Sequence, residues 1–169
     1  AATSVVTQSI ELGTGWNIWS TYVAPETPNM ESMFSAIVDD IVICKDENGS
    51  VYWPAFGLNN IGNITDAAGY QVKTTSDAVL DVTGQLLDPS MEFMIEEGWG
   101  IIGYIKTEPS DATDMMAPVV EDLIIMKDEN GSVYWPAFGL NGIGNMQADE
   151  GYQIKMSADG MFAYPSGSG

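Results

Sequence analysis

The sequence predicts a β-rich α+β protein built from two tandem, pseudo-symmetric units that are mostly antiparallel and carry one short helix each. The main observation is a repeat: the fifteen residues KDENGSVYWPAFGLN occur at 45–59 and, unchanged, 82 positions later at 127–141. In both units, short apolar runs typical of strands flank this block, and an amphipathic stretch precedes it. An internal repeat of this size determines the architecture before any local pattern does.

Each unit is expected to have the order β-α-β-β-β-β. A Gly-Trp sequence opens it, at 15–23 and 98–105, in runs whose aromatic and β-branched residues favour strands. A helix is predicted next because apolar residues recur at helical spacing: Met30, Met33, Phe34, Ile37 and Val38, then Ala112, Met115, Met116, Val119 and Val120. Thr27 and Pro28 are the expected start of the first helix, and Pro118 predicts a short or distorted second one.

A hairpin is the next expected feature of each unit. Strands at 41–45 and 51–53 flank Asn48-Gly49, a pair that tolerates positive φ, and Pro54 ends the returning strand. An ordered loop at 57–63 and strands at 69–74 and 78–82 complete the first unit, and strands at 151–156 and 161–164 end the second. Cys44 is predicted to be buried, because Met126 takes its place in the other copy.

The predicted organisation is an N-terminal strand or arm at 1–14, repeat units at 15–97 and 98–165, and a flexible tail at 166–169. The units either fold separately or intertwine around one core, and one shared core is favoured because about 80 residues without a disulfide or metal bury little apolar surface alone. The weakly alternating segment 3–12 is predicted to be a free strand that pairs with another molecule during assembly. Its assembly residues would be Val5, Val6, Ile10 and Leu12.

Composition excludes several classes of function. The chain has 24 acidic residues, five lysines, no arginine and no histidine, which gives a formal net charge of −19. Nothing in it neutralises a row of phosphates, so nucleic-acid binding is not expected. It also lacks a run of about 18 apolar residues, so no membrane span is predicted. No nucleophile is paired with a base, and we predict no catalytic residues.

Two kinds of binding site are predicted, each with a structural alternative. Carboxylate and amide oxygens at a glycine turn suit Ca²⁺, which makes Asp46, Asn48, Asp128 and Asn130 candidate ligands; the alternative is a hairpin turn held by Asx hydrogen bonds. Exposed aromatic residues stack on sugar rings or anchor protein partners, which favours Trp53, Phe56, Trp135 and Phe138. The alternative is packing in the core, since one of Tyr52 and Trp53 must face inward.

The phrases GWNIWSTYV, IVICKDENGSVYWPAFGLNNIGN and GYQVK, in this order, cover nearly the whole chain twice. They resemble the tandem repeat modules of secreted and surface-attached proteins of marine Bacteroidota and of related phage-borne proteins. The resemblance implies a secreted, extracellular or cell-surface location and a structural or adhesive role. The second unit departs from the pattern at Gly100, where the first has Asn17.

Two functional hypotheses follow. In the first, the chain is a non-enzymatic structural module of a filament, stalk or adhesin that contacts itself or neighbouring modules, with assembly through the N-terminal strand. In the second, the duplicated YWPAFG loops form a bivalent binding module for a glycan or a surface protein.

Overall fold

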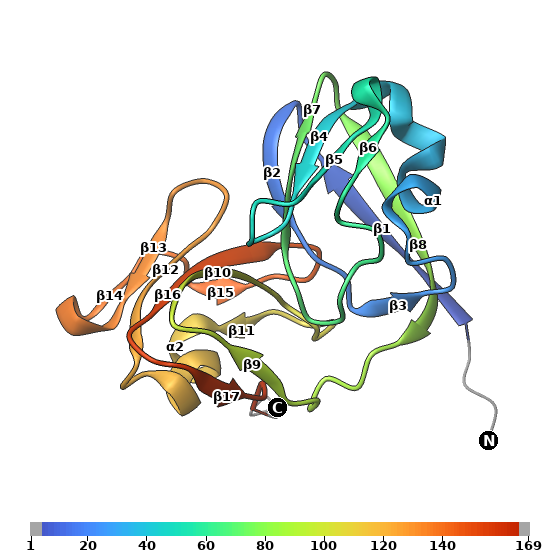
Figure 1. Cartoon of the computed structure of the whole chain (residues 1–169). Helices are drawn as coiled ribbons and strands as arrows, with labels where there is room; N and C mark the ends of the chain where they lie inside the picture. The colour runs from blue at the N-terminus through green and yellow to red at the C-terminus, as the bar shows by residue number, and fades with distance from the viewer. Residues whose placement is uncertain (1–4, 166–169) are drawn as a thin grey trace.

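The computed structural model describes residues 5–165, so the predicted tail and the first four residues of the predicted arm lie outside the described residues. Residues 5–165 form a β-rich structure with two short α-helices and several antiparallel sheets. Figure 1 shows two main sheets, one in the upper half of the view and one at the lower left. Within residues 5–165, no helix is long and apolar enough to cross a membrane.

The two main sheets have five strands each and the same strand order. The first sheet, in spatial order, contains β2 (Gly15–Trp19), β7 (Tyr70–Thr74), β4 (Ile41–Lys45), β5 (Val51–Trp53) and β6 (Leu58–Asn59). The second contains β10 (Gly98–Gly103), β16 (Gly151–Met156), β12 (Leu123–Lys127), β13 (Val133–Trp135) and β14 (Leu140–Asn141). The registers also agree, since Cys44 pairs with Tyr52 and Met126 with Tyr134. The predicted hairpins are confirmed at both positions.

Smaller sheets complete the structure. Their strands are β1 (Val5–Leu12), β8 (Ala78–Leu86) and β3 (Val23–Pro25) in one sheet, β9 (Phe93–Ile95) and β17 (Gly160–Phe162) in a second, and β11 (Ser110–Asp111) and β15 (Asn145–Met146) in a third. β9 lies in the predicted first unit, yet it pairs with β17 of the second. The two strand pairs β1–β8 and β9–β17 have matching registers. Leu12 pairs with Ala78 in the first, and Ile95 pairs with Gly160 at the equivalent positions of the second.

The predicted free strand at 3–12 is wrong over its described part, because β1 pairs along its whole length with β8 of the same chain. Ile10 and Leu12 are buried in the core, Val6 is partly buried and Val5 is exposed. Burial of every second side chain therefore fixes the strand in its own molecule. β1 is nevertheless an edge strand of its sheet, since the order is β1-β8-β3.

Both helices are shorter than their apolar spacing predicts. α1 (Met30–Phe34) and α2 (Ala112–Met116) each continue into 3₁₀ turns, at Ser35–Asp40 and Ala117–Val119. Asn29 caps α1, so the predicted start at Thr27 and Pro28 is two residues early. The first helix is as short as the second although no proline follows it, and Ile37, with a φ of −125°, interrupts the 3₁₀ segment after it.

The described residues contain two hydrophobic clusters, one behind each main sheet. Cys44 and Met126 are fully buried at equivalent positions in them, which confirms the prediction for Cys44. A layer of backbone hydrogen bonds joins the two halves: Ser20 N–H donates to the Asp149 carbonyl at 3.1 Å, and Gly103 N–H donates to the Ala67 carbonyl at 2.8 Å. Backbone hydrogen bonds therefore join the halves, and apolar packing adds to them, because Ala67 and Leu87 belong to the cluster of the second sheet.

The glutamate of each hairpin turn reaches across this junction. Glu47 Oε1 accepts a hydrogen bond from Ile101 N–H at 3.1 Å, and Glu129 Oε1 accepts one from Ile18 N–H at 2.9 Å. Two glycines allow the close approach, because a Cβ at Gly69 would lie 2.7 Å from the Ile102 carbonyl oxygen and one at Gly151 would lie 2.8 Å from that of Trp19. Each half thus contributes the same contacts to the other.

Candidate functional site

Strand alternation gives each main sheet one face toward its core and one face away from it. In the first sheet Tyr52, Cys44 and Val72 point into the core. The intervening residues therefore lie on the opposite face. We call this opposite face, with Trp16, Lys45, Lys73 and Trp53, the outer face of the first sheet; in the second sheet it carries Trp99, Lys127, Lys155 and Trp135.

A tryptophan with two lysines lies on each outer face. The Trp16 side chain is 48% exposed, and the ammonium groups of Lys45 and Lys73 lie 5.2 and 6.0 Å from the centre of its ring. Such distances are within the range of cation–π attraction. The ring is held by its neighbours, yet half of its surface remains available to a ligand.

The second outer face repeats this arrangement. Trp99 is 49% exposed, and the ammonium groups of Lys127 and Lys155 lie 5.2 and 5.8 Å from the centre of its ring. Four of the five lysines in a chain of net charge −19 are therefore placed against two exposed tryptophans. The fifth, Lys106, donates to the Pro165 carbonyl at 2.7 Å.

Sequence reasoning missed this site. Trp16 and Lys73 are neighbours across β2 and β7, 57 positions apart in the chain, and only strand pairing brings them together. One signal was present: both tryptophans and all four lysines occupy equivalent positions of the two repeats.

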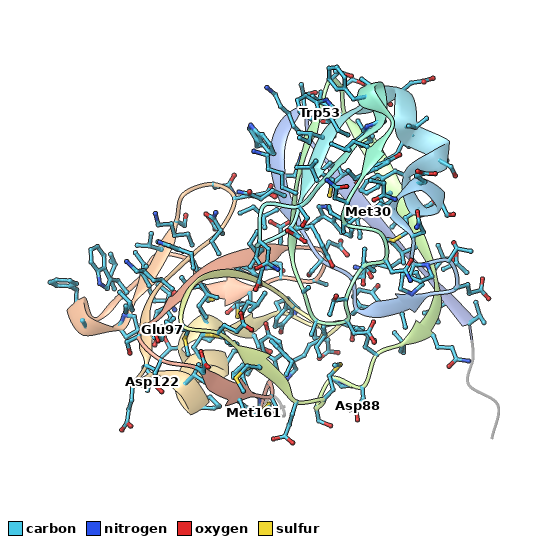
Figure 2. All side chains as sticks on the ribbon, in the orientation of Figure 1. Met30, Trp53, Asp88, Glu97, Asp122 and Met161 are labelled. Atoms are coloured by element: carbon cyan, nitrogen blue, oxygen red, sulfur yellow. The ribbon has the colours of Figure 1, made fainter. Side chains whose placement is uncertain are left out.

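The predicted aromatic residues lie on the same outer faces. Tyr52 is the residue of its pair that faces inward, so Trp53 points outward and is only partly buried. Figure 2 shows Trp53 at the end of the first half that is remote from the second sheet. Phe56 is 71% exposed and contacts Trp53 edge to face, with ring centres 4.7 Å apart. Core packing, the alternative for these residues, therefore holds for Tyr52 and not for Phe56.

The second copy has the same geometry. Trp135 and Phe138 form an edge-to-face pair at 4.7 Å, and Phe138 is 72% exposed. The phenylalanine is held out by a 3₁₀ turn at Pro136–Phe138, which Gly139 ends with a φ of 62°. The proline stops the strand and the glycine takes the left-handed conformation, so the local sequence dictates this projection.

The two tryptophans of one outer face are well separated. Trp16 is on β2 and Trp53 is on β5, with β7 and β4 between them. Three strand spacings correspond to about 14 Å. Lys73 and Lys45 come from the two intervening strands, and both of their ammonium groups lie against the Trp16 ring.

The predicted calcium residues are in the hairpin turns. One oxygen of Asp46 accepts hydrogen bonds from the backbone N–H groups of Asn48 and Ser50, both at 2.9 Å. Asp128 makes the same bonds with Asn130 and Ser132, at 3.0 and 2.9 Å. This is the geometry of an Asx turn, and the described part of the chain has no group of three or more metal-ligating acidic or cysteine side chains. Calcium binding by these residues stays a prediction.

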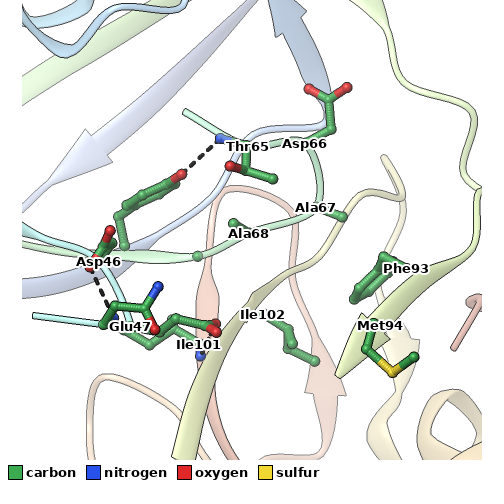
Figure 3. A pocket seen from close by; sticks show the side chains of 13 residues that line it. Asp46, Glu47, Thr65, Asp66, Ala67, Ala68, Phe93, Met94, Ile101 and Ile102 are labelled. Carbon is green, nitrogen blue, oxygen red and sulfur yellow. Dashed lines mark hydrogen bonds between the residues drawn. The ribbon is translucent and has the colours of Figure 1, made fainter. Parts of the chain in front are cut away.

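A cavity of about 290 Å³ lies beside the junction (Figure 3). Its lining combines the acidic Asp46 and Glu47 with the apolar Phe93, Met94 and Ile102. Burial raises the pKa of the Glu47 carboxyl, and the hydrogen bond from Ile101 opposes that shift. The carboxylate of Glu47 is already used to join the two halves, so we assign this cavity to the junction.

A cluster of carboxyl groups lies on the other side of the junction. Burial, and then the negative charges of Glu129, Asp149 and Asp128, raise the pKa of Glu150 to about 7. Asp149 has its pKa raised by burial although Gln8 donates to it at 2.6 Å. From these shifts we expect the stability of the junction to depend on pH.

Comparisons with protein families, with curated proteins and with solved structures find no match for this chain.

Proposed function

We propose that the protein is a non-catalytic, bivalent binding module that uses the two outer faces as equivalent ligand sites. The observation that carries this proposal is the duplicated arrangement of an exposed tryptophan, two lysines and an exposed phenylalanine. Isolated exposed apolar residues are common on protein surfaces, but aromatic residues gathered twice in the same pattern are typical of recognition.

The junction supports bivalency. Reciprocal bonds from Glu47 and Glu129, and the close packing at Gly69 and Gly151, hold the halves in one arrangement. A ligand that has bound one face is therefore presented to the second at a high effective concentration, provided that it spans both. The pairing of two weak sites would give useful avidity without an extensive interface.

We also propose that the repeats are pseudo-symmetric units whose frame begins at β1. The matching registers of β1–β8 and β9–β17 support this frame, which moves the predicted boundaries of 15–97 and 98–165 toward the N-terminus. The proposed location is secreted, extracellular or on the cell surface. It is supported by the resemblance of the repeats to surface modules of marine Bacteroidota and by the high negative charge, which salt screens over roughly 10 Å.

The experiment that tests bivalent binding is a glycan and surface-protein array probed with the wild-type chain. Any ligand found is then measured by calorimetry with Trp16→Ala, Trp99→Ala and the double variant. We expect each single variant to lose avidity and the double variant to lose binding, with unchanged melting temperatures because both side chains are half exposed. Retention of full affinity by the double variant would refute the assignment of the outer faces.

A second candidate function is assembly into a filament or stalk. It is favoured by β1, an eight-residue strand at the edge of its sheet. Edge strands present backbone groups that pair with a strand of another chain. Negative-stain electron microscopy and size-exclusion chromatography of wild type and Thr7→Pro test this: fibres lost in the variant would support assembly, and a wild-type monomer at all concentrations would contradict it.

A further inference from the structure

The outer faces combine two features that restrict the chemistry of a ligand. The aromatic rings of Trp16 and Trp53 offer flat apolar surfaces, and the ammonium groups of Lys45 and Lys73 offer positive charge beside Trp16. Sugar rings stack on aromatic side chains through their apolar C–H faces. Carboxylate and sulfate groups form the strongest hydrogen bonds with ammonium groups.

We propose that each outer face binds an anionic glycan, a chain of sugar rings that carries carboxylate or sulfate groups. This proposal rests on the proposed bivalent function and names its ligand class. Two sugar rings of one oligosaccharide would stack on Trp16 and Trp53, and acidic groups near the ring on Trp16 would meet Lys73 and Lys45. Trp99, Trp135, Lys127 and Lys155 would do the same on the second face.

The spacing favours an extended oligosaccharide over a single sugar. The two rings lie three strands apart, about 14 Å, which several linked sugar rings span and one does not. A protein partner would need a larger apolar contact, since specific protein interfaces bury about 800 Å² on each side.

The distribution of charge supports an anionic ligand. The chain carries 24 acidic residues and only five lysines, yet four of these lysines lie on the outer faces. Asp46 and Glu47 border a cavity of about 130 Å³ beside Trp99, and Glu47 bonds to the backbone of the facing strand.

The test uses three defined polysaccharides: an oligogalacturonate that carries carboxylates, a sulfated dextran fragment, and neutral dextran of the same length. Calorimetry in 150 mM salt compares wild type with Lys73→Gln/Lys155→Gln and with Lys106→Gln as a matched control. Lys106 is the lysine outside both outer faces, and its substitution removes one positive charge without touching a tryptophan.

We expect one or both anionic chains to bind the wild type and the Lys106→Gln control equally well. Binding to the double lysine variant should be at least tenfold weaker, because the loss of a hydrogen bond to a charged group lowers affinity by about that factor. Which anionic chain binds more tightly distinguishes a uronic from a sulfated ligand. Equal binding of neutral dextran, or an equal loss in Lys106→Gln, would overturn the anionic assignment and leave the binding function standing. If the Trp16→Ala/Trp99→Ala variant binds every array ligand as the wild type does, the proposed binding function fails as well.

Discussion

The junction between the halves makes a quantitative prediction for Gly69 and Gly151. A Cβ at Gly69 would lie 2.6 Å from Ile101 Cγ2 and 2.7 Å from the Ile102 carbonyl oxygen, where ordinary contact starts at 3.4 Å. A Cβ at Gly151 would meet the carbonyl oxygen of Trp19 at 2.8 Å. Backbone atoms cannot rotate away, so Gly69→Ala and Gly151→Ala must displace one half from the other.

Overpacking of this kind costs about 1–3 kcal/mol of unfolding free energy. For a chain of 169 residues this corresponds to a fall in melting temperature of roughly 3–10 °C. The assay is urea denaturation followed by tryptophan fluorescence, with calorimetry to show whether the halves unfold in one transition. We expect one transition in the wild type and a lower midpoint in both variants.

Gly13→Ala is the matched control. A Cβ at Gly13 would approach only the Asn17 side-chain oxygen, at an ordinary 3.9 Å. The alanine there is expected to leave stability unchanged or to raise it by up to about 1 kcal/mol, because it reduces the entropy of the unfolded chain. If Gly69→Ala and Gly151→Ala behave like this control, the two halves do not pack as described and the argument for a rigid bivalent module fails.

Three further predictions concern titration, the turns and the thiol. Burial raises the folded-state pKa of Glu150 to about 7, so its contribution to stability is present below about pH 4.5 and is lost as the pH rises to 7. The loss is at most about 3 kcal/mol before solvent screening and about 1–2 kcal/mol after it. The free energy of unfolding of Glu150→Gln, measured by urea denaturation, should not fall over this pH range. Asp46→Ala and Asp128→Ala each remove two backbone hydrogen bonds and should lower the free energy of unfolding by about 1–2 kcal/mol. If millimolar calcium raises the melting temperature of the wild type but not that of the double variant, the predicted calcium sites are established. A wild-type melting temperature that calcium leaves unchanged would contradict them. Burial raises the pKa of the Cys44 thiol well above its usual range, so it should react with a thiol reagent only as fast as the protein unfolds, and rapid labelling of native protein would be inconsistent with its place in the core.

Local patterns predicted the elements that local forces determine. The Asn-Gly turns, the strands at 41–45 and 51–53 and the buried position of Cys44 are confirmed, because turn chemistry and alternation act over a few residues. The apolar spacing through Ile37 and Val38 overestimated the first helix, because those side chains pack from a 3₁₀ turn instead. Apolar spacing alone does not distinguish these two conformations.

Long-range pairings were not predictable in the same way. The segment now seen as β1 alternates weakly, and nothing in its residues specifies β8 as its partner. The two hydrophobic clusters are joined through backbone bonds and the carboxylates of Glu47 and Glu129. These bonds join residues that are distant in the chain, and no local pattern records them.

The sequence by itself determined that the protein is a β-rich duplication, that it is strongly acidic, and that Trp53 and Phe56 with their copies are candidates for recognition. Only the tertiary structure decided that Trp16, Lys45 and Lys73 share one face and that Tyr52 rather than Trp53 enters the core. The physical reason is that a strand shows which residues alternate, while the register and the partner strand decide what each face contains.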